Sequence, residues 1–272
     1  MASVPADLAP RVASALVLAA LALGAAYVGG HLFTLFWLIA SVAVLWEWNR
    51  MVGLGAERAA FIAGAAGLAA AAGFSIMSIP EFGLVAVGAA ALVCVAFTRG
   101  RISPLWSGGG VVYAGALITA ACLLRGSVTD GFRAILWLFA VVWVTDVMAY
   151  VFGRAIGGPK LWPSVSPKKT WAGFLGGVIC GALAGLAVMP VASTWPVVLV
   201  LGLLTAMVSQ GGDLFESSLK RRFGVKDSSQ LIPGHGGVMD RLDGFIAATV
   251  FAALVGTLHL GPASAAYGIF RW

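Results

Sequence analysis

The chain has 272 residues, of which 60% are hydrophobic and only 10% carry a charge, and its mean hydropathy is +0.97. Charged residues make up about a quarter of an average soluble domain, so this composition excludes an ordinary soluble globular protein. The three cysteines, Cys94, Cys122 and Cys180, lie inside separate apolar runs, which predicts packing residues and excludes a disulfide framework or zinc site. The net charge of +6 is spread over short segments between apolar runs, which favours a membrane protein over a nucleic-acid-binding protein.

Nine apolar segments approach the length of about 20 residues that a transmembrane helix needs. They are residues 12–28, 32–48, 59–79, 83–98, 111–124, 134–152, 172–189, 197–212 and 245–260. The fifth is the shortest, and it can be extended into a glycine-rich approach at 108–110. The first has no clear cleavage site after it, so we interpret it as a retained span. We predict an all-α, polytopic integral membrane protein with about nine transmembrane helices in one domain, residues 1–272.

The positions of Lys and Arg predict the orientation, because cytoplasmic flanks carry an excess of both. With the amino terminus in the cytoplasm, 14 of the 17 Lys and Arg residues lie on the cytoplasmic side. The two long polar segments, 153–171 and 213–244, then face the cytoplasm too, and only the second has room for a substantial soluble element. We therefore expect a catalytic cavity that opens to the cytoplasm, where nucleotides are found.

Asp146 is a candidate functional residue because it lies well inside the sixth apolar segment. A central aspartate costs roughly 2.5–3.5 kcal/mol on membrane-insertion scales, so such residues are functional candidates. Helical spacing places Asp146, Tyr150 and Arg154 on one side of the helix. The alternative is a buried ion pair that only fastens helices together.

Asp213 follows the eighth apolar segment, and a helical continuation would place Glu216 or Ser217 and then Lys220 on the same face. The basic residues 220–222 come next. Such a cluster is either a positively charged anchor at a lipid surface or a binding site for substrate phosphate. Its closeness to the carboxylates favours phosphate.

Residues 233–243, Pro-Gly-His-Gly-Gly-Val-Met-Asp-Arg-Leu-Asp, are the most informative stretch. Glycines let a backbone approach a phosphate closely, and Asp240 and Asp243 can share one helical face. Paired carboxylates without His or Cys partners suit Mg²⁺, which prefers oxygen ligands and bridges protein to phosphates. Asp240, Asp213 and Asp146 are therefore candidates to converge on one metal site. His235 is a phosphate contact, a general acid or a turn residue, and the sequence does not separate these roles.

The segment 157–171 is too rich in Pro and Gly for a helix and predicts an ordered loop. Its Ser166, Lys168, Lys169 and Thr170 offer cations and hydroxyls suited to a triphosphate. A generic cytoplasmic loop would carry the lysines too.

Two blocks of the sequence resemble a known family. One block reads Ser218-Leu219-Lys220-Arg221, then Lys226-Asp227, Ser229, Ile232-Pro233, His235-Gly236-Gly237-Val238 and Asp240-Arg241-Leu242-Asp243; the other reads Asp146 through Tyr150, Gly153-Arg154 and Ser166 through Thr170. At these positions the chain closely resembles the phosphatidate cytidylyltransferases, also called CDP-diacylglycerol synthases. The apolar pattern extends the resemblance over essentially the whole chain. Ala172 is a mild departure, since relatives often have a polar residue there.

The resemblance implies an all-helical enzyme of the bacterial inner membrane that converts CTP and phosphatidate to CDP-diacylglycerol and pyrophosphate for phospholipid synthesis. It further implies a homodimer that depends on Mg²⁺, with a second cation such as K⁺. Asp213 and Asp240 are then metal ligands, and Asp146 and Asp243 lie close by as further catalytic residues. The expected substrate-binding residues are Ser166, Lys168, Lys169, Thr170, Lys220, Arg221, Lys226, His235, Gly236, Gly237 and Arg241.

Three other functions remain as alternatives. A secondary transporter should have polar residues at the midplane of several helices, whereas here they gather near the cytoplasmic helix ends. A membrane phosphatidyltransferase that consumes CDP-lipids should have a run of spaced aspartates that this chain lacks. A lipid kinase would release a nucleoside diphosphate, so the release of pyrophosphate distinguishes it from a cytidylyltransferase.

Overall fold

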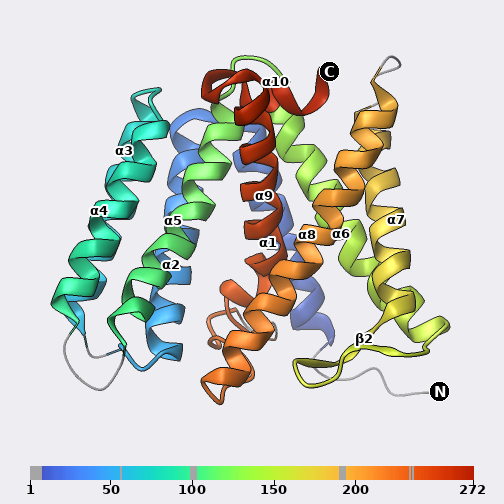
Figure 1. Ribbon diagram of the computed structural model, residues 1–272, viewed down its shortest axis with the longest axis horizontal. Coiled ribbons are helices and arrows are strands. Elements are labelled where there is room, and N and C mark those ends of the chain that lie inside the picture. The colour runs from blue at the N-terminus through green and yellow to red at the C-terminus, as the bar shows by residue number, and fades with distance from the viewer. Residues whose placement is uncertain (1–7, 56, 99–102, 190–193, 233, 235) are drawn as a thin grey trace.

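Nine long helices run side by side through the residues that the computed structural model describes, which are 8–55, 57–98, 103–189, 194–232, 234 and 236–272 (Figure 1). They are α1 (Leu8–Val28), α2 (Gly30–Met51), α3 (Arg58–Ile76), α4 (Glu81–Phe97), α5 (Pro104–Gly126), α6 (Gly131–Ala155), α7 (Trp171–Val188), α8 (Trp195–Arg222) and α9 (Met239–Leu260). Strands β1 (Lys160–Trp162) and β2 (Ser166–Thr170) form an antiparallel hairpin between α6 and α7. The last described elements are a 3-10 turn, η1 (Pro262–Ser264), and the short helix α10 (Ala265–Phe270).

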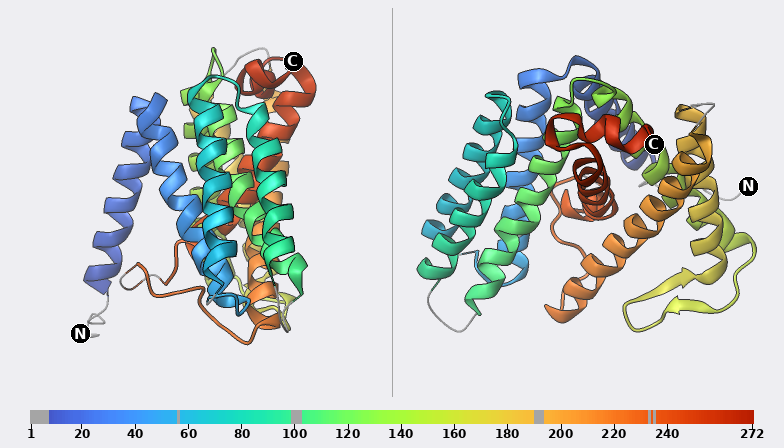
Figure 2. Two further views of the ribbon diagram at one scale, coloured as in Figure 1. Left: turned by 90° about the vertical axis from the view of Figure 1, so that its left-hand side faces the viewer. Right: turned by 45° about the horizontal axis from the view of Figure 1, so that its top comes forward.

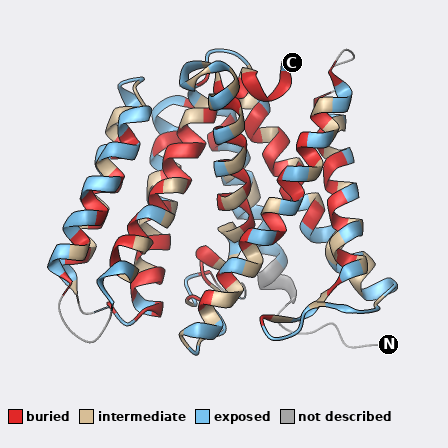
Figure 3. Cartoon of the chain, viewed as in Figure 1, coloured by how far each residue is buried: buried red, intermediate tan, exposed pale blue. Residues whose placement is uncertain are grey.

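Each of the nine predicted apolar segments falls on one of these helices, which confirms an all-α, polytopic membrane protein. Seven of the described helices, α2, α3 and α5 to α9, are long and apolar enough to cross a membrane, and the apolar parts of α1 and α4 are shorter. The outward faces carry exposed residues (Figure 3), and many of these are large and apolar, such as Leu92, Leu105 and Leu258. An apolar outer surface is what a lipid environment requires, and every helix satisfies its backbone internally.

The connections fall at the two ends of the bundle (Figures 1 and 2). The α2–α3 connection, the β-hairpin and residues 223–232 lie at the same end as the start of α1. The α1–α2 and α5–α6 turns and α10 lie at the other end. Both long polar segments therefore share one end of the molecule, as the sequence predicted.

Two polar segments differ from what the sequence predicted. The segment 153–171 is not only a loop, because its second half pairs into the hairpin, with Lys160 opposite Thr170. The segment 213–244 holds no substantial soluble element in its described residues: α8 continues to Arg222 and α9 already begins at Met239. The α8 extension is held by the Lys220–Glu216 pair, one helical turn apart, and the early turns of α9 carry the motif aspartates.

The glycine-rich approach at 108–110 is helical and belongs to α5, so the fifth span is one of the longer ones. Gly110 lies directly against the ring of Trp48, and Gly108 lies against the backbone of Ala91, so neither position has room for a side chain. These glycines let α5 approach α2 and α4 closely, and α5 is the most deeply buried of the spans.

A stripe of glycines fastens α7 to α6. Gly173, Gly177, Gly181 and Gly185 recur every fourth residue on α7, and each lies against α6. A Cβ at Gly173 would lie 2.6 Å from the carbonyl oxygen of Ala149, and one at Gly177 would lie 2.7 Å from that of Thr145. Small residues at this spacing allow two helices to touch backbone to backbone. The tight pair fixes the position of the hairpin that joins it.

Candidate active site

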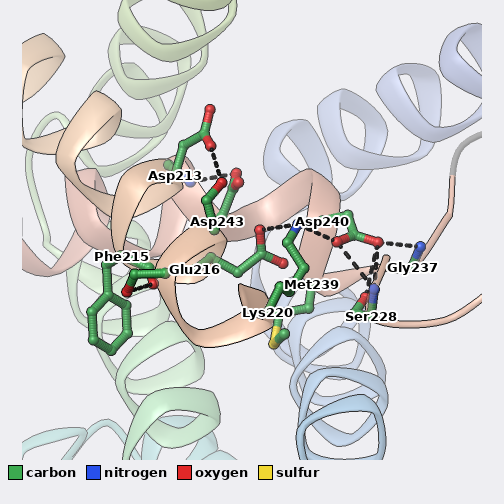
Figure 4. A network of polar contacts seen from close by, with 12 residues as sticks. Asp213, Phe215, Glu216, Lys220, Ser228, Gly237, Met239, Asp240 and Asp243 are labelled. Atoms are coloured by element: carbon green, nitrogen blue, oxygen red, sulfur yellow. Dashed lines mark hydrogen bonds and ion pairs between the residues drawn. The ribbon is translucent and has the colours of Figure 1, made fainter. Parts of the chain in front are cut away.

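A chain of charged and polar side chains runs from α8 to α9 at the end of the bundle that carries the hairpin (Figure 4). Asp213, Glu216 and Lys220 project from successive turns of α8, while Asp240 and Asp243 project from the first turns of α9. Asp243 lies beside Asp213 and Glu216, and Lys220 lies between Glu216 and Asp240. We call Asp213, Glu216 and Asp243 the carboxylate cluster.

Asp240 is surrounded by donors. Lys220 Nζ lies 2.7 Å from Asp240 Oδ1, and the Gly237 N–H donates to Oδ2 at 2.8 Å. The backbone N–H of Ser228 donates to both oxygens at 3.2 and 3.0 Å, and the Ser228 hydroxyl lies 3.0 Å from Oδ2. The side chain is only 6% exposed. Both oxygens are therefore committed to fixing the loop before α9, which disfavours the predicted role of Asp240 as a metal ligand.

The carboxylate cluster is short of donors. Lys169 Nζ lies 2.6 Å from Asp213 Oδ2, the Ser217 hydroxyl donates to Asp213 Oδ1 at 3.2 Å, and Lys220 Nζ lies 2.8 Å from Glu216 Oε2. Glu216 Oε1 is buried and accepts no N–H or O–H donor among the described residues, and the Glu216 carboxylate lies next to that of Asp243. The Asp243 carboxylate accepts the neighbouring Gly244 N–H at 2.7 Å and is within electrostatic range of three other carboxylates.

Asp146 is the third of those carboxylates. It lies on α6, near enough to interact electrostatically with Asp213, Lys169 and Arg241. Asp146, Tyr150 and Arg154 follow one another at intervals of four residues on the continuous helix α6, as predicted, and the Arg154 guanidinium donates a hydrogen bond of 2.9 Å to the Tyr150 hydroxyl. Asp146 and Asp213 thus approach each other across the gap between α6 and α8, as the sequence suggested.

The donor set of the carboxylate cluster fits a hard cation. Like charges held close together repel each other, and a buried oxygen without a donor, such as Glu216 Oε1, calls for a positive partner. Among the described residues, no three His, Cys, Asp or Glu side chains are placed so that they could hold a metal ion by themselves. An incomplete set of oxygen ligands suits Mg²⁺, which keeps water ligands and takes others from substrate phosphates.

Glu47 is a polar residue of this region that sequence reasoning missed. It projects from α2, is fully buried, and accepts hydrogen bonds from the backbone N–H of Val238 at 2.8 Å and of Met239 at 2.6 Å. The hydroxyl of Ser229 donates to it at 2.6 Å, and that of Ser228 lies 3.2 Å away. Glu47 therefore caps the start of α9 from another helix and holds the loop that embraces Asp240.

The signal for Glu47 was present in the sequence. It is a carboxylate inside the second apolar segment, so the rule that singled out Asp146 applies to it equally. The same contacts explain the glycine at 237, where a Cβ would collide with Ser228 Oγ and the Glu47 carboxylate.

An apolar groove of about 1110 Å³ lies between α5, α8 and α9. Its lining includes Val112, Phe215 and Ile246, and also Asp243, which belongs to the carboxylate cluster. Arg222, whose guanidinium lies 5.1 Å from the centroid of the Trp106 ring, lines it at the end of α8. The apolar groove thus reaches the carboxylate cluster at Asp243.

Several predicted substrate-binding groups already have partners in the fold. The Thr170 hydroxyl accepts the Gly173 N–H at 3.1 Å and caps α7, and the Gly237 N–H is donated to Asp240. Arg221 makes a long contact of 3.5 Å with the carbonyl of Val165 in the hairpin turn. These contacts give Thr170, Gly237 and Arg221 structural roles.

The other predicted substrate-binding residues do not all lie at the carboxylate cluster. Lys169 reaches the carboxylate cluster, whereas Lys168 is exposed and Ser166 half-buried on the same strand. Lys226 lines a separate polar pocket beside Trp46 of α2. Gly236 accepts the Ile232 N–H through its carbonyl at 2.8 Å, Arg241 is exposed near Asp146, and His235 lies outside the described residues.

Comparison with known proteins gives the family. Residues 9–259 match the model of the family described as the cytidylyltransferase family. Proteins named phosphatidate cytidylyltransferase from Brucella abortus (strain 2308) and Brucella suis biovar 1 (strain 1330) are 40% identical over 262 residues, which cover 94% of this chain and 96% of each relative. One of the same name from Staphylococcus saprophyticus is 47% identical over 122 residues, 43% of this chain and 46% of that protein. The chain therefore belongs to the cytidylyltransferase family.

Proposed function

We propose that this chain is a phosphatidate cytidylyltransferase, which joins CTP to phosphatidate and forms CDP-diacylglycerol and pyrophosphate. The observation that carries the proposal is that the carboxylate cluster borders an apolar groove on one side and the polar hairpin on the other. Asp243 lines the apolar groove between α5, α8 and α9, whereas Asp213 is paired with Lys169 of the polar hairpin. A lipid and a water-borne nucleotide can therefore reach the same carboxylates from opposite sides of α8. The names of the relatives support the same reaction.

In the reaction, a phosphate oxygen of phosphatidate attacks the α-phosphorus of CTP. The bond from the α-phosphorus to the oxygen that bridges to the β-phosphorus breaks, and pyrophosphate leaves with that oxygen. Reactions of this kind are catalysed mainly by positioning and by neutralising charge, so no covalent enzyme intermediate is required. Lys169 and Arg241, on the polar side near Asp146 and Asp213, are the side chains proposed to hold the nucleotide phosphates.

Mg²⁺ is the proposed cofactor, held by Asp213 and Asp243. These residues replace the predicted pair Asp213 and Asp240, because Asp240 has both oxygens committed to Lys220, Ser228 and Gly237. When bound, the cation would supply positive charge to the phosphates and to the leaving pyrophosphate. Lys220, shared by Glu216 and Asp240, positions the two motif segments relative to each other. A second cation such as K⁺ stays a prediction.

The topology proposed is nine spans with the amino terminus in the cytoplasm of a bacterial cell and the chain in its inner membrane. The excess of Lys and Arg in the connections at the hairpin end supports this orientation. The active site then faces the cytoplasm, where CTP is found. The homodimer that the resemblance implies also stays a prediction, and chemical cross-linking in native membranes would test it.

The experiment that tests the function is pyrophosphate release by the purified protein in detergent with Mg²⁺. We expect release only when CTP and phosphatidate are both present, with CDP-diacylglycerol formed in equal amount. Replacing phosphatidate by diacylglycerol, which lacks the attacking phosphate, should abolish release. Release of a nucleoside diphosphate would instead identify a kinase, and a folded protein without either product would refute the proposal.

A further inference from the structure

Tyr113 of α5 carries a buried hydroxyl that the fold leaves without a partner. Its oxygen is shielded from solvent and makes no hydrogen bond to any of the described residues. Burying a phenol hydroxyl without a partner costs about 1–3 kcal/mol, so tyrosine at such a position calls for a partner that binds there. Phenylalanine would fill the same apolar space without that cost.

Neighbouring rings fix where the hydroxyl points. The Tyr113 ring lies against the ring of Trp48, with centroids 5.3 Å apart, and against that of Phe215 at 6.0 Å. All three residues line the apolar groove, together with Asp243. Rings packed on two sides lose most of their rotational freedom, so the hydroxyl is held in one position.

That position is beside the carboxylate cluster. Tyr113 is within electrostatic range of Asp243, Glu216 and Asp213, yet no carboxylate oxygen is close enough to accept its proton. The hydroxyl is thus a donor set at the boundary between an apolar groove and a charged centre. A ligand that satisfies it must bring an acceptor oxygen to the cluster while lying in the groove.

We propose that Tyr113 is a substrate-binding residue whose hydroxyl donates a hydrogen bond to the phosphate of phosphatidate. The inference rests on the proposed function and assigns the groove side of the cluster to the lipid substrate. A phosphate oxygen on CTP offers the same chemistry, but the nucleotide has no apolar part to occupy the groove. The lipid phosphate enters with its acyl chains along Val112 and Ile246 and stops where Tyr113 and Asp243 meet.

Tyr113→Phe tests this role, because it removes only the hydroxyl and keeps the packing with Trp48 and Phe215. Tyr27→Phe is the matched control, since Tyr27 is 74% exposed on α1. We expect kcat/KM for phosphatidate to fall about 10- to 100-fold in Tyr113→Phe, as for a lost hydrogen bond to a charged group, while KM for CTP stays within twofold. The thermal unfolding midpoint should not fall, because the hydroxyl has no partner in the fold. A fall would indicate a structural role.

Diacylglycerol with the same acyl chains separates headgroup from chain recognition. It should inhibit wild type and Tyr113→Phe equally, because it has no phosphate for Tyr113 to contact. A rise in KM for CTP alone would assign the hydroxyl to the nucleotide and overturn the proposal, as would kinetics equal to those of Tyr27→Phe. A wild type that releases no pyrophosphate would refute the proposed function itself, so the two failures are distinguishable.

Discussion

Asp240 and Asp243 lie about one helical turn apart on α9 and meet opposite surroundings. The Asp240 carboxylate accepts hydrogen bonds from Lys220, Gly237 and Ser228, so its negative charge is neutralised by donors of the fold itself. Asp243 stands beside Asp213 and Glu216, with more negative charge than the neighbouring donors offset. One short motif thus supplies two kinds of aspartate. Asp240 belongs to what we call the closed side, where the hydrogen bonds of the loop satisfy the carboxylate. Asp243 belongs to the open side, with Asp213 and Glu216, which we propose to be the side that meets a cation and the substrates.

The largest effect is expected when negative charge is removed from the open side. Asp243→Asn and Asp213→Asn keep the side-chain size, and we expect each to lower kcat for pyrophosphate release by about 10²- to 10³-fold, the scale on which one charge-stabilising group acts in a site with little water. The thermal unfolding midpoint in detergent should not fall, because repulsion between neighbouring carboxylates is relieved. Turnover within threefold of wild type would remove both residues from the cation site.

On the closed side, Asp240→Asn should damage both folding and turnover. An amide in place of the carboxylate cannot satisfy Lys220 and the Ser228 and Gly237 N–H groups together, so we expect the free energy of unfolding to drop by about 1–3 kcal/mol. The kcat should fall about 10- to 100-fold, as when a supporting group around a metal site is lost. Chemical denaturation and pyrophosphate release measure the two effects. A stable variant with no turnover at any Mg²⁺ concentration would return Asp240 to the role of ligand.

Much of this architecture could be predicted from the sequence. The apolar runs gave the helices because a bilayer accepts only closed backbone hydrogen bonding, and intramembrane or motif carboxylates pointed to Asp146, Asp213 and Asp243. The sequence could not predict which motif aspartate has its oxygens taken up by hydrogen bonds within the fold. That depends on Ser228 and Gly237 folding back onto Asp240, and local spacing says nothing about such a loop.

Two further residues show where prediction from the sequence stops. Glu47 was accessible to the rule used for Asp146, but its partners on the α8–α9 loop lie at the opposite end of the chain. Tyr113 gave no signal at all, because a lone tyrosine in an apolar helix is usually packing. Only its place in the groove, beside Asp243, distinguishes it.

Glu47→Gln should loosen the closed side, because Glu47 holds the start of α9 from helix α2. Glutamine keeps the size but offers one acceptor oxygen where the Val238 and Met239 N–H groups need two. We expect kcat to fall about tenfold, with a higher Mg²⁺ concentration needed for half-maximal turnover, because the start of α9 shifts the carboxylate cluster. Glu57→Gln is the control, since Glu57 makes no side-chain hydrogen bond in its position before α3. Equal kinetics for the two variants would contradict the role of Glu47 in holding the start of α9.

The smallest effect is expected for Lys169, which lies on the hairpin side of the carboxylate cluster. Lys169 lies 2.6 Å from Asp213 and is 22% exposed, so it is partly screened by solvent, and pairs of this kind contribute about 1 kcal/mol or less. Lys169→Ala should therefore raise KM for CTP about three- to fivefold and leave kcat/KM for phosphatidate within twofold, because the lipid arrives on the far side of α8. Lys160→Ala, on the paired strand of the same hairpin, supplies the matched loss of charge without a contact to the cluster. If Lys169→Ala changed kcat/KM equally for CTP and phosphatidate, the proposal that lipid and nucleotide reach the carboxylate cluster from opposite sides of α8 would be wrong.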